Sequence, residues 1–167
     1  MIDLKEIKNK IATKNNLYCL IVILIIFFLD RYTKLLILDN FSENTYYLND
    51  YINLDLIWNI GIGFGFFSTD SNILYNLISL VIALVIIFLL YIFIISETLD
   101  KMIFTLILGG ALGNFYDRLV YKAVPDFIDL HYNNFHWFTF NVADIFISVG
   151  IIAFIFRGFS VKNIKNE

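Results

Sequence analysis

The sequence has few charges, one cysteine and one proline, and these shortages limit the class of protein. Charged residues make up 16% of the 167 residues, whereas 59% are hydrophobic and 18% are aromatic. A chain of this composition is too apolar for an ordinary soluble domain, so we expect an integral membrane protein. The single cysteine, Cys19, excludes an internal disulfide, and its place in an apolar stretch is typical of an inert buried thiol.

Several motifs that carry chemistry are also missing. There is no Gly-x-Ser-x-Gly elbow, no phosphate-binding loop and no basic stripe for nucleic acid. His131 and His136 lie close in sequence to Asp126 and Asp129, but they lack the helical spacing and the intervening glutamate of a zinc protease. We therefore expect no bound metal, no other cofactor and no nucleic-acid partner.

Four apolar stretches are each long enough to cross a membrane as a helix. They are residues 17–38, 73–95, 102–121 and 141–159. One span needs about 20 residues, because the hydrocarbon core is about 30 Å thick and a helix rises about 1.5 Å per residue. The first stretch has no cleavage site of small residues and continues past Asp30 into further apolar residues, so we expect a retained helix.

The fold class that follows is a mainly α-helical membrane protein with four transmembrane helices. Residues 1–167 would form a single integral membrane domain, because the four spans leave no room for a separate soluble one. Two external segments, at about 39–70 and 122–140, would connect the first span to the second and the third span to the fourth.

The external segment at 39–70 has the pattern of a small β-sheet. Every second residue from Ile52 to Trp58 is large and apolar, a period of two that predicts a half-buried strand. The glycines of residues 59–65 let the backbone bend or approach a ligand closely, and the aromatic residues beside them suit a membrane interface. We expect an external sheet that cradles an extended peptide, and a plain re-entrant turn is the alternative.

The external segment at 122–140 is expected to be an aromatic loop or helix at the membrane interface. Pro125 removes a backbone donor and pushes Val124 out of helical geometry, so the third helix should end before Asp126. The carboxylate of Asp126 would then lie on irregular backbone at the outer surface.

Lys and Arg are distributed unequally between the two sides of the predicted membrane domain. Residues 39–70 contain none, although they contain five acids. The flanks on the other side contain Lys5, Lys8, Lys10, Lys14, Lys101, Arg157, Lys162 and Lys165. Because cytoplasmic loops are enriched in Lys and Arg, both termini are expected in the cytoplasm and both external segments on the far side.

Asp126 and Asp144 are the most informative polar residues. Asp144 opens the last apolar stretch, and Asp126 lies close to the end of the preceding one, with no obvious cationic neighbour for either. Ionisable groups at membrane depth are costly and usually functional. Both acids are expected at the same outer depth, where two close carboxylates would share one proton. This favours an enzyme site in which the two acids act together. The alternative is a proton or cation path in a small transporter or in the binding subunit of one.

Helical spacing organises the other polar and small residues of the spans. Asp30 and Lys34 are i,i+4, so they can pair on one face of the first helix. This pair could belong to a site or only lower the cost of insertion. Gly109, Gly110 and Gly113 form a smooth face that allows close helix packing.

Asn114, Asp117 and Arg118 can lie on one face of the third helix. Asp117 is expected to neutralise Arg118 locally, which leaves the guanidinium to bind a carbonyl, carboxylate or phosphate. The cluster is either an interfacial anchor or part of a site, and its nearness in sequence to Asp126 favours a site.

Five short segments resemble a known family by their order along the chain. They are residues 30–34 (Asp-Arg-Tyr-Thr-Lys), 59–65 (Asn-Ile-Gly-Ile-Gly-Phe-Gly), 109–118 (Gly-Gly-Ala-Leu-Gly-Asn-Phe-Tyr-Asp-Arg), 124–129 (Val-Pro-Asp-Phe-Ile-Asp) and 140–144 (Phe-Asn-Val-Ala-Asp). Together with the four spans, they are similar to bacterial lipoprotein signal peptidase, signal peptidase II, across essentially the whole chain. The resemblance implies an intramembrane aspartic endopeptidase that cleaves prolipoproteins just before their diacylglyceryl-modified cysteine.

The same resemblance implies roles for particular residues. The catalytic dyad would be Asp126 and Asp144, with the proton belonging to the pair rather than to one assigned acid. The supporting residues would be Asn59, Asn114, Arg118, Asn141, Asp30, Lys34, Asp117 and Gly113. Arg31 stands where the family commonly has Gln, and Gly63 where it commonly has Ala or Ser. These departures are expected to alter substrate fit rather than activity.

The resemblance also implies a setting for the protein. Its partners would be lipid-modified prolipoproteins and membrane lipids. It would act as a monomer, because a four-helix unit with a complete dyad needs no second copy. Its location would be the bacterial inner membrane, with the active site near the external face.

Overall fold

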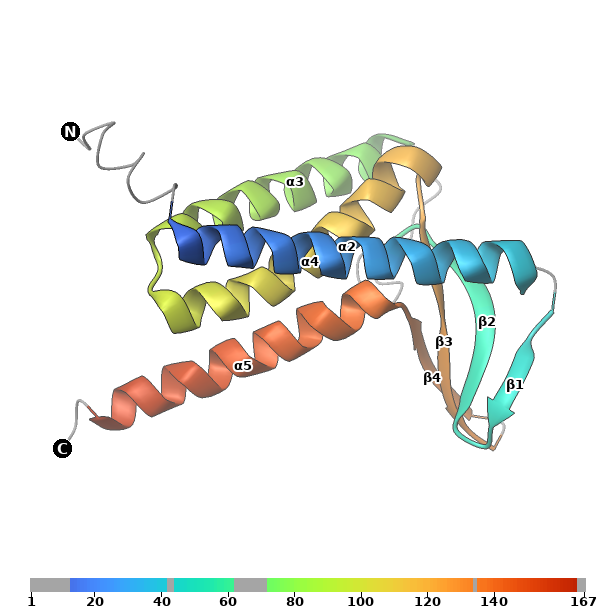
Figure 1. Ribbon diagram of the computed structural model, residues 1–167. Helices are drawn as coiled ribbons and strands as arrows, with labels where there is room; N and C mark the ends of the chain where they lie inside the picture. Colours follow the sequence, from blue (N-terminus) through green and yellow to red (C-terminus); the bar gives the residue numbers. More distant parts are fainter. Residues whose placement is uncertain (1–12, 42–43, 62–71, 134, 165–167) are drawn as a thin grey trace.

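The computed structural model describes residues 13–41, 44–61, 72–133 and 135–164, with only the backbone at 72 and 160–164. Its helices are α2 (Lys14–Asn40), α3 (Asn72–Ile95), α4 (Thr98–Tyr121) and α5 (Val142–Ile164). Its strands are β1 (Tyr46–Asn49), β2 (Ile52–Asn59), β3 (Val124–Tyr132) and β4 (Phe135–Phe140). The helices lie alongside one another, and the strands form a sheet at one end of them (Figure 1).

Each predicted span coincides with most of one helix. In the described part of the chain, Ile73–Ile95 of α3 and Val142–Phe159 of α5 are long and apolar enough to cross a membrane. Helices α2 and α4 are of similar length, with 27 and 24 residues, but each carries several charged side chains. Large apolar side chains of α3 are exposed, up to 80% for Ile73, as expected for a helix that faces lipid. Four membrane crossings stay a prediction.

Local chemistry explains where two of the helices begin and end. The hydroxyl of Thr13 caps α2 by accepting the backbone N–H three residues later at 3.1 Å. Helix α4 ends at Tyr121, and Lys122 has a left-handed φ of 55° before the chain enters the strand that contains Pro125. The prediction that the third helix ends before Asp126 is confirmed.

The sheet has four antiparallel strands in the order β1-β2-β3-β4. The strand predicted between Ile52 and Trp58 is confirmed as β2. The expectation of an interfacial loop or helix at 122–140 was wrong, because most of this segment forms β3 and β4. Its aromatic and β-branched residues favour strands, and β3 is paired on both sides, so its backbone groups find partners without a helix.

Asp126 lies within β3, opposite Ile57 of β2, and is only 3% exposed. The prediction of irregular backbone at the outer surface was therefore wrong for this residue. Pro125 is tolerated beside it because proline near the beginning of a strand removes the least from the hydrogen-bonded ladder. The sheet, rather than a loose loop, thus fixes the direction of the Asp126 side chain.

The close helix packing predicted for the glycine face is confirmed. A Cβ added at Gly110 would lie 2.4 Å from the carbonyl oxygen of Ala143 on α5, and one at Gly109 would lie 2.8 Å from an isoleucine of α2. At Gly113 the added atom would lie 2.5 Å from a carboxylate oxygen of Asp30. The glycines therefore allow α4 to lie directly against α2 and α5, which brings Asp30 and the beginning of α5 to the same place.

The apolar core lies among α2, α3 and α4. Leu108 is fully buried, and Phe104 and Cys19 are each 5% exposed within the same cluster. Cys19 is a free buried thiol, as predicted. Asp30, Lys34 and Asp117 lie in the halves of α2 and α4 nearer the sheet, whereas the buried pair of Lys101 and Asn16 lies at the opposite end of these helices.

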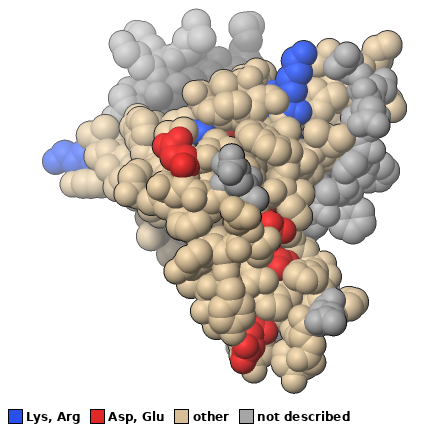
Figure 2. All heavy atoms as spheres, turned by 90° about the vertical axis from the view of Figure 1, so that its right-hand side faces the viewer, with Lys and Arg blue, Asp and Glu red and all other residues tan. Residues whose placement is uncertain are grey.

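The two ends of the molecule differ in charge. Helix α2 begins and α5 ends at the end opposite the sheet (Figure 1). The four strands contain no Lys or Arg, and Figure 2, which faces the sheet end, shows acidic side chains along it. This is the asymmetry on which the predicted orientation rests, and the orientation itself stays a prediction.

Candidate active site

The carboxylate of Asp126 is held by two amides. Asn59, the last residue of β2, donates from Nδ2 to Asp126 Oδ2 at 2.8 Å. Asn141, between β4 and α5, donates from Nδ2 to Asp126 Oδ1 at 2.5 Å. Because each carboxylate oxygen has its own donor, the side chain has one fixed orientation.

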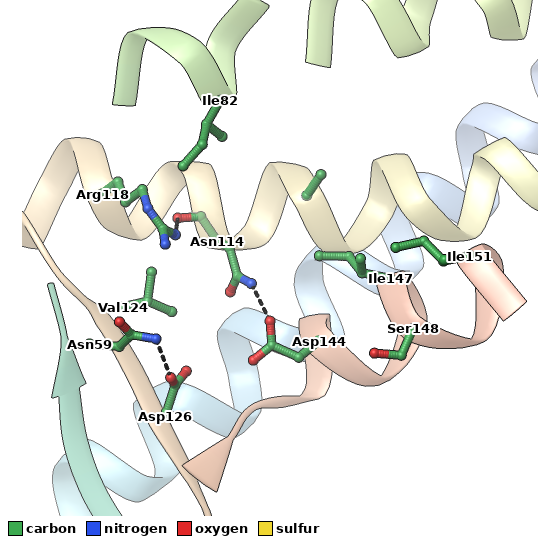
Figure 3. Close-up of a pocket in the computed structure, with 11 residues that line it drawn as sticks. Asn59, Ile82, Asn114, Arg118, Val124, Asp126, Asp144, Ile147, Ser148 and Ile151 are labelled. Carbon is green, nitrogen blue, oxygen red and sulfur yellow. Dashed lines mark hydrogen bonds between the residues drawn. The ribbon is translucent and has the colours of Figure 1, made fainter. Parts of the chain in front are cut away.

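Asp144 lies in the first turn of α5 and forms a reciprocal cap with Asn141. The backbone N–H of Asn141 donates to Asp144 Oδ2, and the backbone N–H of Asp144 donates to Asn141 Oδ1, both at 3.1 Å. This is the pattern of a capping box, with an aspartate in the usual place of a glutamate. The other carboxylate oxygen, Oδ1, accepts from Asn114 Nδ2 at 2.8 Å (Figure 3). An acid at a helix N-terminus is also stabilised by the helix dipole.

Asn141 connects the two acids directly. It is 0% exposed, its side chain donates to Asp126, and its backbone donates to Asp144. Both acids also face one cavity of about 290 Å³ (Figure 3). The cavity is lined by Asn59, Ile82, Ala111, Asn114, Arg118, Val124, Asp126, Asp144, Ile147, Ser148 and Ile151. The other walls are mostly apolar, so a bound molecule would meet the two carboxylates, their amides, the guanidinium of Arg118 and the hydroxyl of Ser148 as polar groups.

The environment of Asp126 favours its protonated form. Burial is the largest cause and the nearby negative charge of Asp144 adds to it, so that together they raise the pKa of Asp126 from 3.8 to about 6. The hydrogen bonds from Asn59 and Asn141 and the positive charge of Lys34 oppose this rise. A carboxyl group tuned in this way can hold or release a proton near neutral pH.

A cation lies close to the two acids, contrary to the expectation that they have no cationic neighbour. Lys34 is 0% exposed, and its ammonium donates to Asp30 at 2.8 Å, to Asn114 Oδ1 at 2.8 Å and to Asp117 at 2.7 Å. The predicted Asp30–Lys34 pair is thus confirmed, but as part of a buried network. Asp30 also accepts the backbone N–H of Ala143 at 3.0 Å, and so anchors the beginning of α5.

The predicted neutralisation of Arg118 by Asp117 was wrong. Asp117 pairs with Lys34 and Arg31 of α2 instead. Arg118 donates to the carbonyl oxygen of Gly61 at 2.7 Å and to that of Asn114 at 3.2 Å. The reason is geometric, because neighbouring residues of a helix do not face each other. Arg118 therefore fastens the end of β2 to α4 and leaves part of its guanidinium at the cavity.

Arg31 was not predicted as a site residue. The sequence suggested an additional charge near the outer interface, yet Arg31 is only 8% exposed and donates to Asp117. Its spacing of three residues from Lys34 was the available signal, because it places both cations toward the same side of α2. The other departure from the family pattern, Gly63, lies outside the described residues.

The histidines lie away from the cavity. His136 Nδ1 is 2.7 Å from Asp129 Oδ2, and the rings of His131 and His136 stack with their centroids 5.4 Å apart. Within the described residues, no group of three or more His, Cys, Asp or Glu side chains is arranged to hold a metal ion. The histidines and Asp129 instead join β3 to β4.

The helical bundle with a terminal sheet is also the fold of solved bacterial membrane enzymes. One, solved by the in meso method at 2.3 Å resolution, superposes with a TM-score of 0.72 at 25% identity and covers 90% of this chain and 91% of its own. A second, solved by the same method at 1.9 Å resolution, has a TM-score of 0.70 at 24% identity over 84% of this chain and 91% of its own. The fold is therefore that of a membrane enzyme.

Sequence comparison identifies the family. The family described as "Signal peptidase (SPase) II" matches residues 22–160. A lipoprotein signal peptidase of Pelagibacter ubique (strain HTCC1062) is 50% identical over 95% of this chain and 98% of that protein. Relatives with the same description are 40% identical in Francisella tularensis subsp. novicida (strain U112), over 83% of this chain and 88% of the relative, and 41% identical in Thermodesulfovibrio yellowstonii (strain ATCC 51303 / DSM 11347 / YP87), over 82% and 91%. The chain belongs to the signal peptidase II family and is a protease. The transporter alternative loses its support.

Proposed function

We propose that this protein removes signal peptides from diacylglyceryl-modified prolipoproteins, and that Asp126 and Asp144 catalyse the cleavage just before the lipidated cysteine. The observation that carries the proposal is the double contact of Asn141, which donates to both acids and holds them at one cavity. The family match and the relatives described as lipoprotein signal peptidases support the substrate class.

The two acids would act as one unit. One proton is shared between them, because two close carboxylates do not both ionise cheaply. The ionised member takes a proton from a water molecule, which attacks the scissile carbonyl carbon. The protonated member donates its proton to the oxygen as negative charge develops there. The member that took the proton from water then gives it to the amide nitrogen as the C–N bond breaks, and the hydroxyl proton returns to the other acid as the carbonyl group re-forms, so the dyad again holds one proton. No covalent intermediate is needed.

The supporting residues would keep the acids ready for this step. Asn59 and Asn114 each donate to one acid, so they favour the orientation in which the remaining lone pairs face the cavity. Asp30 holds the backbone of Ala143 and thereby the first turn of α5. Positioning of this kind saves reorganisation at the moment of reaction.

The proposed setting is the bacterial inner membrane, crossed by α2, α3, α4 and α5. Both termini would be cytoplasmic, and the sheet and dyad would lie near the external face. The exposed apolar side chains of α3 and the absence of Lys and Arg from the strands support this placement. A single copy in contact with membrane lipids would suffice, because Asp126, Asp144 and their amide donors all come from one chain.

The substrate class can be tested with two forms of one precursor. The purified protein is incubated with a prolipoprotein whose cysteine carries the diacylglyceryl group and with the same precursor lacking it. The lipidated form should be cleaved far faster, because each buried CH₂ contributes roughly 0.8 kcal/mol to binding. Equal rates for the two forms would contradict the lipoprotein assignment while leaving a general protease in place.

A further inference from the structure

Arg31 has no part in the mechanism above, yet it is buried against α4. It is 8% exposed and donates to Asp117 Oδ1. Its guanidinium also lies over two rings of α4, 4.9 Å from the centroid of Tyr116 and 5.7 Å from that of Tyr121. Burial of an arginine is costly unless its charge is paired, and here an anion and two aromatic faces compensate it.

Arg31 completes the charge balance of a buried group. The group consists of Asp30, Arg31, Lys34 and Asp117, and three of the four side chains are 0% exposed. Asp117 offers one oxygen to Arg31 and the other to Lys34. Without Arg31, two buried carboxylates would share one ammonium, and a negative charge would be left uncompensated.

The group reaches Asp144 through Asn114. An ammonium has three donors and no acceptor, and Lys34 uses them on Asp30, Asp117 and the amide oxygen of Asn114. Because Asn114 turns its oxygen toward Lys34, its NH₂ group faces the dyad and donates to Asp144 at 2.8 Å. The position of Lys34 thus decides whether the oxygen or the NH₂ group of the Asn114 amide faces Asp144.

We propose that Arg31 is a positioning residue for the dyad. It holds one oxygen of Asp117, so that Lys34 stays within reach of Asn114 and keeps the Asn114 amide turned toward Asp144. Arg31 is also connected to the sheet, because Tyr121 beside it packs against Trp58 of β2 with ring centroids 5.7 Å apart. This inference rests on the proposed catalytic role of the dyad.

The proposal predicts an effect on the pH profile of cleavage. The charged side chains close to the dyad are Asp30 and Lys34 of α2 and Arg118 of α4, with Asp117 of α4 behind Lys34, while β2 contributes a neutral amide. Removal of the Arg31 charge makes the net charge around the dyad more negative. Proton binding by the dyad, and with it the activity profile, should therefore move to higher pH.

The test measures kcat, KM and the pH profile for cleavage of a lipid-modified precursor by the full-length protein. In contrast to the expectation that Arg31 alters substrate fit, Arg31→Gln should lower kcat roughly tenfold with little change in KM, a typical size for loss of one member of a hydrogen-bonded network. Its profile should move up by about one pH unit, as expected for loss of one unit charge close to a buried pair. Arg31→Lys keeps the charge and should restore most of the profile. The matched control is Arg157→Gln, which removes a pair with Asp100 at the ends of α4 and α5 far from the dyad and should change neither kcat nor the pH profile.

The outcomes separate this inference from the proposed function. An unshifted profile with wild-type kcat in folded Arg31→Gln overturns the positioning role. If Arg31→Gln does not fold, Arg31→Lys decides, and a profile shifted to higher pH in that variant overturns the role of the charge. Asp126→Asn is measured in the same assay, and efficient cleavage by that variant overturns the proposed function whatever Arg31 does.

Discussion

Asp126 shows at the scale of a single residue how a proposed catalytic group costs stability. Its carboxylate is 3% exposed and, among the described residues, its hydrogen-bond donors are the neutral amides of Asn59 and Asn141. Neutral donors replace part of the lost hydration but do not cancel the charge. The site therefore keeps a carboxyl group that protonates easily, at some expense to the folded state.

The free-energy cost of burying the ionised Asp126 carboxylate predicts that stability depends on pH. Because burial and Asp144 raise the pKa of Asp126 from 3.8 to about 6, the folded protein binds more protons than the unfolded chain between these values. The contribution of Asp126 to stability should therefore fall as pH rises from about 4 to about 6, by about 3 kcal/mol. Asp126→Asn should lack this fall and be more stable than the wild type above that window. Unfolding midpoints measured in detergent across the window check this, and parallel curves for the two proteins would contradict it.

The sequence predicted some residues of the site because their signal is local. Asp126 and Asp144 stand out as acids beside apolar spans, and the spacing of Asp30 and Lys34 predicts their pair. The partner of Asp117 could not be found in this way. Asp117 binds a cation of another helix, 86 residues away, and such a pairing depends on how α2 and α4 pack.

At the scale of elements, the helices were easier to predict than the second half of the sheet. Long apolar stretches define α3 and α5, and Pro125 explains why α4 does not continue to Asp126. The strands β3 and β4 are rich in aromatic residues, which suit a membrane interface as well as a sheet. Their pairing with β2 is a contact distant in sequence, so local pattern alone did not reveal it.

The contact between α4 and α5 predicts the effect of one methyl group. Gly110→Ala would place a Cβ 2.4 Å from the carbonyl oxygen of Ala143, so the helices must separate. We expect a loss of about 1–3 kcal/mol of stability together with reduced cleavage, because Asp144 lies one residue further on. Gly158→Ala is the matched control, since its added Cβ meets nothing within 4 Å. Unfolding midpoints and cleavage rates of both variants check this, and equal behaviour would contradict the close packing.

At the scale of the whole molecule, the distribution of charge and the arrangement of the helices and the sheet favour the same orientation in the membrane. The turn between α3 and α4 lies at the end where α2 begins, and the sheet lies at the other end (Figure 1). The sheet carries acids but no Lys or Arg in its strands. This arrangement would place the dyad at the level where the spans leave the membrane on the external side.

The orientation predicts which cysteines an impermeant thiol reagent can label in intact cells. Asp50→Cys, in the exposed turn between β1 and β2, should be labelled without permeabilisation. Glu97→Cys, in the exposed connection between α3 and α4, should be labelled only after the membrane is opened. The unchanged chain serves as control, because Cys19 is buried. The reverse pattern would overturn the orientation and place the dyad on the cytoplasmic side.

The most direct test of the account is cleavage of a lipid-modified prolipoprotein by Asp126→Asn, Asp144→Asn and the double variant. Each substitution keeps the size of the side chain and removes the ionisable group. Each single variant should cleave slower by roughly 10³-fold or more, and the double variant should be no worse, because the two acids act as one unit. Substantial cleavage by either single variant, at wild-type amounts of folded protein, would contradict the two-aspartate mechanism.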